Sequence, residues 1–313
     1  MPLAVGPAIS QMRELMELVL TLVAPPNAGA FSLNLREVFA GVGAKGTSSR
    51  QLEAGESAVT DVFLEGPDAA TVRAALQAPM ADQQLDWCVQ PVKGRRKRLL
   101  IADMDSTIIN VECLDELADY AGLKAEISAI TERAMRGELA FEGALRERVA
   151  MLKGLPVTAL QAAYDERVRL NPGARTLVRT MSNFGARCAL VSGGFSFFTG
   201  RVAQAAGFQS HRGNSLGEAD GKLTGLVDDP ILGREAKLAA LNEDARLFGI
   251  PMAETLAVGD GANDLAMIEA AGLGVAYRAK PVVAAQADAR VDHTDLTTLL
   301  YFQGYSQDDF VTD

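Results

Sequence analysis

Two aspartates follow an apolar run in the sequence Asp-Met-Asp-Ser-Thr at residues 103–107. A carboxylate at the end of a buried strand is costly unless hydrogen bonds or a cation compensate it, so Asp103 and Asp105 predict a loop that holds a cation. Ligands that are all oxygen favour Mg²⁺, which often bridges to a substrate phosphate. An aspartate-rich turn, or a helix cap made by Ser106 or Thr107, is the alternative interpretation.

A second acidic motif, Gly-Asp-Gly-Ala-Asn-Asp at residues 259–264, follows another apolar run. Its glycines permit tight backbone turns. Asp260 and Asp264 add oxygen ligands, or groups that support such ligands. Taken alone, the motif also fits a tight turn before a capped helix. Combined with the first motif, it strengthens the prediction of a metal site.

Two further features fit the binding of a phosphate group. Ser192 and Gly193 belong to a Ser-Gly-Gly sequence that we expect to end a strand and open a helix, where a hydroxyl and free N–H groups bind anions. Lys237 lies near the start of the next predicted helix and would supply a cation. Each feature also has an ordinary interpretation, as a small-residue loop and a solvated surface lysine.

The elements that must position these residues alternate between strands and helices. Apolar runs at residues 99–102, 188–191 and 255–258 end in the three motifs. Short apolar strands that alternate with helices indicate a parallel sheet covered on both faces. Ligands of such sheets bind beyond the carboxyl ends of the strands, so we expect the motifs to meet there. The helical spacing of apolar residues within 114–181 predicts a helical cap, and the glycines among alternating residues at 213–227 predict a hairpin.

The composition of the 313-residue chain excludes several classes of protein. With 30 Lys and Arg against 40 Asp and Glu, the net charge is -10, which argues against a general affinity for nucleic acid or anionic membranes. No apolar stretch reaches the length of a membrane span. Three widely spaced cysteines do not form a disulfide framework, which favours reduced thiols and a cytoplasmic location.

The basic run Lys-Gly-Arg-Arg-Lys-Arg at residues 93–98 predicts a solvated linker between two units. Upstream, the elements predict the order βαββαβ, in which Pro79 ends the second helix. This order is typical of the ferredoxin-like plan and resembles ACT-type regulatory domains, which bind small molecules. A dimerisation or packing module without a ligand is an equal alternative. The predicted strands span 17–23, 47–52, 58–64 and 85–89, and the predicted helices span 31–39 and 68–78.

The order of the motifs resembles the haloacid-dehalogenase-like phosphohydrolases: Asp-x-Asp, then Ser, then Lys, then an acidic Gly-Asp loop. Within that superfamily, Glu112, the cap segment 135–141 and its continuation at 145–149 are similar to the phosphoserine phosphatase family. The resemblance covers about residues 98–310. It implies an α/β fold, a three-layer Rossmann-like parallel sheet with an inserted helical cap. The ferredoxin-like, ACT-like α+β unit would precede this fold.

The resemblance also implies a role for each site residue. Asp103 is the expected nucleophile and Asp105 the general acid and base. The expected ligands of Mg²⁺ are Asp103, the main-chain carbonyl of Asp105, and Asp260, with Asp264 supporting the metal shell or Lys237. The residues expected to bind the phosphate are Ser192, Gly193, Lys237 and Asn263.

The cap residues are expected to choose the substrate. Phosphoserine carries an ammonium and a carboxylate, for which Glu112 and Arg148 are the expected partners. Met135 and Phe141 would line the apolar wall. Without the resemblance, Glu112 and Arg148 fit better as a solvated pair on helical surfaces.

These expectations combine into a Mg²⁺-dependent hydrolysis of O-phospho-L-serine to L-serine through an aspartyl phosphate, the last step of serine biosynthesis. Alternatives are a phosphotransferase to another hydroxyl amino acid and a serine-sensing regulatory protein. The expected units are residues 1–93 as an ACT-like regulatory or assembly domain, and residues 94–313 as the catalytic domain with its cap. The expected partner is the small substrate, with no nucleic acid and no membrane, and homodimerisation stays open.

Overall fold

The computed structural model describes residues 15–26, 34–54, 58–135 and 139–312. Within them the chain forms twelve strands and twelve α-helices. The strands are β1 (Met16–Ala24), β2 (Lys45–Ala54), β3 (Ala58–Gly66), β4 (Asp86–Pro91), β5 (Leu99–Ala102), β6 (Arg187–Phe195), β7 (Ser210–Asn214), β8 (Leu216–Ala219), β9 (Lys222–Val227), β10 (Thr255–Gly259), β11 (Leu273–Tyr277) and β12 (Ala289–Val291). The helices are α1 (Leu35–Gly41), α2 (Ala69–Met80), α3 (Cys113–Tyr120), α4 (Lys124–Met135), α5 (Phe141–Met151), α6 (Thr158–Arg167), α7 (Ala174–Asn183), α8 (Ser196–Ala206), α9 (Arg234–Leu247), α10 (Leu265–Ala270), α11 (Pro281–Ala284) and α12 (Thr298–Phe302).

Ten of the strands form one sheet in the order β2-β3-β1-β4-β12-β11-β10-β5-β6-β7. The strands from β12 to β7 in this order pair in parallel. β5 lies between β10 and β6, so the three strands that carry the polar motifs are neighbours. The predicted parallel sheet is confirmed.

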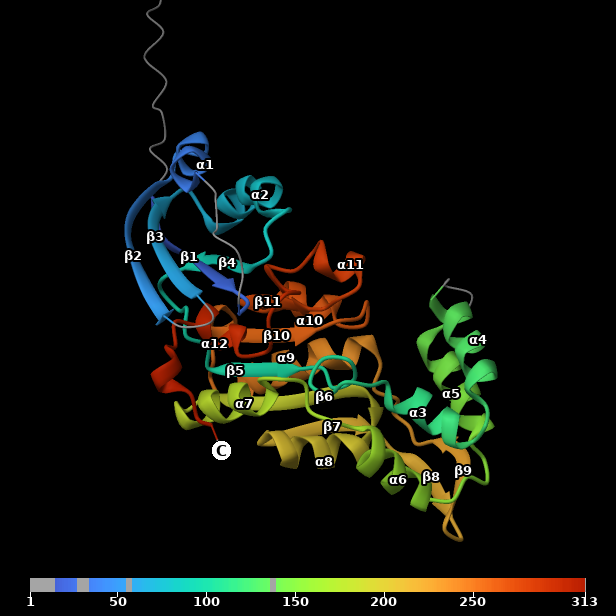
Figure 1. Ribbon diagram of the computed structural model, residues 1–313. Coiled ribbons are helices and arrows are strands. Elements are labelled where there is room, and N and C mark those ends of the chain that lie inside the picture. Colours follow the sequence, from blue (N-terminus) through green and yellow to red (C-terminus); the bar gives the residue numbers. More distant parts are fainter. Residues whose placement is uncertain (1–14, 27–33, 55–57, 136–138, 313) are drawn as a thin grey trace, which may run out of the picture.

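Apolar side chains on both faces of β5 explain why this strand is buried. Leu99 and Ile101 belong to one hydrophobic cluster, with residues of α9, α10 and α11. Leu100 and Ala102 belong to the opposite cluster, with residues of α7, α8 and α12. Because successive side chains of a strand point to opposite faces, the continuous apolar run places a helical layer on each side of the sheet (Figure 1).

The cap projects from the carboxyl side of the parallel strands and contains α3, α4, α5 and α6 (Figure 1). The predicted hairpin is confirmed as the antiparallel pair of β8 and β9, and β9 packs against α5. Most of α7 lies within the residues that we predicted as cap, 114–181, but the helix packs on β6 and α8. The layered core therefore includes α7, and the hairpin lies with the cap.

The N-terminal strands confirm the predicted order βαββαβ and form the antiparallel part of the sheet. β4 joins this part to β12 through the antiparallel pair Trp87 and Arg290. The first helix spans Leu35–Gly41 rather than 31–39, and residues 31–33 lie outside the described part of the chain. α2 continues through Pro79 to Met80. The predicted stop was wrong because a single residue follows Pro79 in α2, so the lost backbone N–H affects the final turn alone.

The basic run at residues 93–98 is solvated in part, because Lys93, Arg96 and Arg98 are exposed but its other two basic residues are buried. The Arg95 guanidinium is buried and donates to Asp61 at 2.6 Å and 2.7 Å. It also donates to the carbonyl of Phe302 at 2.8 Å, at the end of α12. Lys97 is buried as well and donates to the carbonyl of Ala253 at 2.9 Å. The charge pattern did not predict this burial, because it does not show that the buried carboxylate of Asp61 needs a cation.

The structure can be compared with the expectations for membrane spans and for the cysteines. Within the described residues, no helix is both long enough and apolar enough to cross a bilayer. The three cysteines, Cys88, Cys113 and Cys188, are buried and carry free thiols.

Candidate active site

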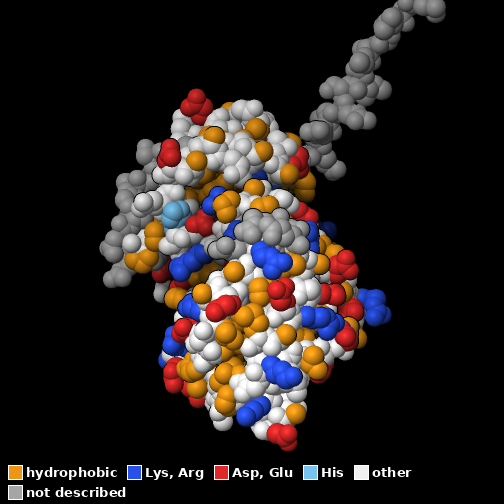
Figure 2. All heavy atoms as spheres, turned by 90° about the vertical axis from the view of Figure 1, so that its right-hand side faces the viewer, with side chains coloured by type: hydrophobic (Ala, Val, Ile, Leu, Met, Phe, Trp, Pro, Cys, Tyr) orange, Lys and Arg blue, Asp and Glu red, His pale blue; other side chains and the backbone are white. Residues whose placement is uncertain are grey.

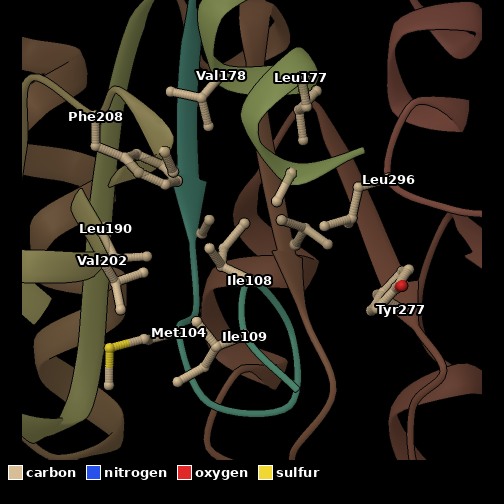
Figure 3. Close-up of a cluster of buried hydrophobic side chains, with 14 of the residues drawn as sticks. Met104, Ile108, Ile109, Leu177, Val178, Leu190, Val202, Phe208, Tyr277 and Leu296 are labelled. Carbon is tan, nitrogen blue, oxygen red and sulfur yellow. The ribbon is translucent and has the colours of Figure 1, made fainter. Parts of the chain in front are cut away.

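The first acidic motif is held in place by its apolar neighbours. Met104, Ile108 and Ile109 are fully buried, and Figure 3 shows all three among the side chains of the core cluster. The N–H of Asp103 donates to the carbonyl of Val258 at 3.0 Å, which continues the pairing of β5 with β10 for one residue. The loop is therefore rigid where it places the two carboxylates, because its apolar side chains are packed in the core.

Lys237 lies between two carboxylates in the interior of the site. Its Nζ donates to Oδ1 of Asp103 at 2.6 Å and to Oδ1 of Asp264 at 2.5 Å. All three side chains are buried. Burial by itself lowers the pKa of Lys237, but the two carboxylates together raise it above its ordinary value. Lys237 is therefore a permanent cation and not a solvated surface lysine.

The second acidic motif forms a tight turn around Asp264. Oδ2 of Asp264 accepts hydrogen bonds from the N–H groups of Asp260 at 3.2 Å and Gly261 at 3.0 Å. A Cβ on Gly259 would lie 2.4 Å from Cγ of Asp264, so a side chain at Gly259 would displace the carboxylate. Asp264 thus connects the turn to Lys237.

Three carboxylates of the site lie close enough together to share a cation. Carboxylate oxygens of Asp103, Asp260 and Asp264 lie within 4.8 Å of one another. Burial raises the pKa of Asp103, and Asp264 raises it further. Burial and Asp264 also raise the pKa of Asp260, to about 6. Three acidic groups at this distance fit a hard divalent cation, because its charge offsets their repulsion and carboxylate oxygens are its preferred ligands.

Asp105 is oriented by two donors. Its Oδ1 accepts the N–H of Cys113, in the first turn of α3, at 3.0 Å, and its Oδ2 accepts the hydroxyl of Ser192 at 3.1 Å. Burial raises the pKa of Asp105, although these hydrogen bonds lower it. A carboxyl group whose protonated form is favoured can donate a proton, as a general acid must. Cys113 was not among the predicted site residues, because sequence does not show which backbone N–H meets a side chain.

The Ser-Gly-Gly sequence lies in a different element from the one predicted. β6 continues to Phe195 and α8 begins at Ser196, so the sequence does not open a helix. The pairing of β6 with β7 is irregular between Val191 and Phe195. The N–H of Gly194 donates to Oγ of Ser192 at 2.8 Å. The helix was predicted too early, because a bulged strand end and a helix start share the same small residues.

Phe141 connects the cap to this strand end. It begins α5, and its Cζ lies 3.0 Å from the position that a Cβ on Gly193 would occupy. Any side chain at Gly193 would therefore push the ring away. The close approach places the apolar wall predicted for Phe141 directly over the end of β6.

Glu112 and Arg148 lie on the cap side of the site. Glu112 is exposed overall, but its carboxyl group turns to Ser106, whose Oγ donates to Oε1 at 2.6 Å. Burial of the carboxyl group, followed by the charge of Asp105, raises the pKa of Glu112 to about 7. Arg148 donates to the carbonyl of Ala144 at 3.1 Å. Its charge is close enough to Glu112 for the two to interact electrostatically.

For two predicted site residues, Met135 and Asn263, the structure gives less detail about the side chain. Met135 ends α4, but its side chain lies outside the described part of the structure. Asn263 is half-buried in the turn, with its Oδ1 2.3 Å from the position of a Cβ on Gly261. The three polar motifs, with Asp103, Ser192 and Asp260, lie at the carboxyl ends of the neighbouring strands β5, β6 and β10, whereas Lys237 lies in α9 and the cap residues lie at the start of α3 and on α5.

The outer surface of the cap carries mixed charges. Figure 2 shows this end of the molecule, where acidic, basic and hydrophobic side chains are interspersed. On the face in view, the two signs of charge are not separated into large patches. On this face no large patch of positive charge is in view, so the cation nearest the acidic motifs is Lys237, which is buried inside the site.

Comparisons with known proteins show a family and several relatives to which this chain is similar. The family model for haloacid dehalogenase-like hydrolases matches residues 100–269. A phosphoserine phosphatase of Polaromonas sp. strain JS666 is 49% identical over 208 residues, 65% of this chain and 88% of the relative. The crystal structure of a probable phosphoserine phosphatase from Vibrio cholerae is 30% identical, with a TM-score of 0.70, and covers 94% of this chain and 88% of its own.

A further structure is described as a phospho-aspartyl intermediate analogue of phosphoserine phosphatase. It is 39% identical, with a TM-score of 0.62, and covers 66% of this chain and 99% of its own. The sequence relative and this structure match about two thirds of the chain, whereas the Vibrio cholerae structure also covers most of the N-terminal region.

Proposed function

This chain belongs to the haloacid dehalogenase-like hydrolase family, and we propose that it hydrolyses O-phospho-L-serine to L-serine and inorganic phosphate. The convergence of Asp103, Asp260 and Asp264 around the buried cation of Lys237 is the observation that carries the proposal. Such an arrangement suits a reaction in which a carboxylate attacks the phosphorus of a phosphate dianion. The similarity to phosphoserine phosphatases supports phosphoserine as the substrate.

Asp103 is the proposed nucleophile. An oxygen of its carboxylate attacks phosphorus, the bond from phosphorus to the seryl oxygen breaks, and an aspartyl phosphate forms. Lys237, which contacts Asp103 at 2.6 Å, stabilises negative charge on the transferred group. The hydroxyl of Ser192, the N–H of Gly193 and the amide of Asn263 are the proposed donors to the other phosphoryl oxygens.

Asp105 is the proposed general acid and base. The seryl oxygen leaves with the proton of Asp105, and the resulting carboxylate then removes a proton from the water that hydrolyses the aspartyl phosphate. The hydrogen bonds from Cys113 and Ser192 hold its two oxygens in position for both transfers. At the end of the cycle Asp103 is free and Asp105 is again protonated.

Mg²⁺ is the proposed metal, held by Asp103, the main-chain carbonyl of Asp105, and Asp260. When bound, it reduces the repulsion between the nucleophile and the phosphate. Asp264 is the proposed supporting residue, because both of its oxygens already accept hydrogen bonds from Lys237 and from the turn.

We expect phosphate release from phosphoserine to stop when EDTA removes divalent ions and to return with added Mg²⁺. Without a cation, three neighbouring carboxylates repel the phosphate. The measurement is a phosphate-release assay with phosphoserine, phosphothreonine, O-phosphoethanolamine and ethyl phosphate. A rise in melting temperature on adding Mg²⁺, with no substrate present, provides a second readout. Undiminished turnover in EDTA, or no preference for phosphoserine, would contradict the proposal.

Arg148 is the proposed partner of the substrate carboxylate, and Glu112 of its ammonium. We expect Arg148→Ala to raise KM for phosphoserine roughly 30-fold to 100-fold, and KM for ethyl phosphate less than about threefold, because ethyl phosphate has no carboxylate. Steady-state kinetics on both substrates checks this expectation. Arg146→Ala is the matched control, since Arg146 lies on the same helix and pairs with exposed Asp229. Equal losses on both substrates would refute the role of Arg148.

The N-terminal region, residues 1–93, is the proposed ACT-like regulatory or assembly unit, preceding a catalytic unit at residues 94–313. The order βαββαβ supports this proposal. The pairing of β4 with β12 and the contact of Arg95 with both Asp61 and Phe302 give this unit a direct connection to the catalytic sheet. Light scattering of the full chain, with and without L-serine, tests whether it assembles as a homodimer and whether serine alters the assembly.

A further inference from the structure

Ser106 is a residue that the proposed mechanism does not use, yet its conformation is unusual. Its φ is 57°, in the left-handed region. Among the described non-glycine residues, two others have a positive φ, Asp220 and Arg278. A serine adopts this conformation at a cost, and it persists where the surroundings hold it. Here the N–H of Ser106 donates to the carbonyl of Val111 at 3.3 Å, which closes the loop between the two residues.

The left-handed backbone directs the Ser106 hydroxyl to Glu112. Oγ donates to Oε1 of Glu112 at 2.6 Å. Glu112 occupies the N-cap position of α3, where a side chain that caps the helix accepts the N–H of the second or third helical residue. The side chain of Glu112 makes no such bond, and the N–H of the first helical residue, Cys113, donates to Asp105. The hydroxyl of Ser106 therefore determines the direction of the Glu112 carboxylate.

This contact fixes one oxygen of the carboxylate. Within the described part of the chain, Oε2 of Glu112 has no hydrogen-bond partner, while Oε1 is held by Ser106. A glutamate side chain at an exposed position otherwise samples several rotamers, and ordering it on binding costs entropy. Holding Oε1 in advance removes part of this cost and presents Oε2 to a cationic group of the substrate.

We propose that Ser106 is a positioning residue for substrate selectivity, which acts through Glu112 on the ammonium group of the substrate. This inference rests on the proposed function, because it requires a substrate that carries an ammonium group. It adds that the contact between Ser106 and Glu112 helps the enzyme to select such substrates over other phosphomonoesters. Ser106 itself does not contact the reacting phosphoryl group.

The test uses Ser106→Gly, because glycine adopts the left-handed conformation without strain and the substitution removes the hydroxymethyl group that contacts Glu112. The readout is the ratio of kcat/KM for a substrate with an ammonium group to that for ethyl phosphate, which has none. We expect this ratio to fall roughly tenfold to a hundredfold for phosphoserine and for O-phosphoethanolamine, as when a hydrogen bond to a charged group is lost. Asp220→Gly is the matched control, since Asp220 also has a positive φ but lies in the β8–β9 turn. It should leave the ratio unchanged.

A double-mutant cycle separates positioning from a general structural role. In a Glu112→Gln background, Ser106→Gly should lower the ratio by less than about twofold, because the carboxylate through which Ser106 acts is absent. Equal losses on all substrates in Ser106→Gly, an unchanged ratio, or a full further loss in the Glu112→Gln background would each overturn the inference. If the unsubstituted enzyme does not prefer substrates with an ammonium group, the proposed function fails as well.

Discussion

Replacing Asp103 by asparagine should lower the turnover of phosphoserine by a factor on the order of 10⁴ or more, because an amide has no anionic oxygen with which to attack phosphorus. The fold should survive the substitution. Asparagine has nearly the same shape as aspartate, and burial together with the charge of Asp264 already raises the pKa of Asp103, so the loss of its charge relieves repulsion. The cost is the ion pair with Lys237 at 2.6 Å, because the asparagine oxygen can accept the same hydrogen bond but carries no charge.

Two measurements check this expectation. Phosphate release gives the turnover, and acid quenching with phosphoserine labelled at phosphorus shows whether label stays on the protein. Label should be retained by the unsubstituted enzyme and be absent from Asp103→Asn. Asp82→Asn is the control, since Asp82 is exposed just after α2 and should keep full turnover and labelling. Normal turnover of Asp103→Asn would show that Asp103 is not the nucleophile, and the proposed function would then be wrong.

Replacing Lys237 by methionine should abolish most activity and also destabilise the fold. Methionine keeps the length of the side chain but leaves Asp103 and Asp264 buried without their shared cation. Removing one partner of a buried ion pair costs about 3–5 kcal/mol, because the remaining charge is left unpaired. Turnover should fall by on the order of 10³ or more, since the transferred phosphoryl group loses its cationic partner.

The loss of stability in Lys237→Met should depend on pH. Burial raises the pKa of Asp103 in the folded state, so the folded state binds a proton at this carboxylate more tightly than the unfolded state does. Stability is therefore greatest at low pH and is lost as pH rises through the range between the unfolded and folded pKa values. The free energy of unfolding in urea, without added metal, should be closer to that of the unsubstituted protein at pH 5 than at pH 8.

Lys222→Met provides the matched control, because Lys222 is exposed on the β8–β9 hairpin and its removal should change neither stability nor turnover appreciably. A deficit below about 1 kcal/mol for Lys237→Met, or one that is equal at both pH values, would show that the two carboxylates do not depend on this lysine.

Much of the site followed from the sequence, because the parallel-sheet pattern places strand ends together. The runs before Asp103, Ser192 and Asp260 predicted β5, β6 and β10, and these strands are neighbours in the sheet. The sequence was less informative where a short segment fits two structures. Ser-Gly-Gly belongs to an irregular strand end and not to a helix start, and α2 accommodates Pro79 near its end.

The N-terminal region illustrates a second kind of limit. The order of its elements was readable, since hydrophobic periodicity and turn residues are local signals. The way in which this region attaches to the catalytic sheet could not be predicted from the sequence. Arg95 was interpreted as part of a solvated linker, yet it pairs with Asp61, 34 positions earlier, and with the end of α12. Charge in a sequence says nothing about which distant carboxylate it will meet.

The sequence by itself determined the chemistry that is available: which strands are apolar, which carboxylates and cations follow them, and in what order. The tertiary structure alone decided three contacts, namely Phe141 against Gly193, Ser106 against Glu112, and Lys237 between Asp103 and Asp264. The physical reason is that periodicity and propensity act between residues close in the chain. Contacts across long separations depend on how whole elements pack, and packing is a property of the assembled core.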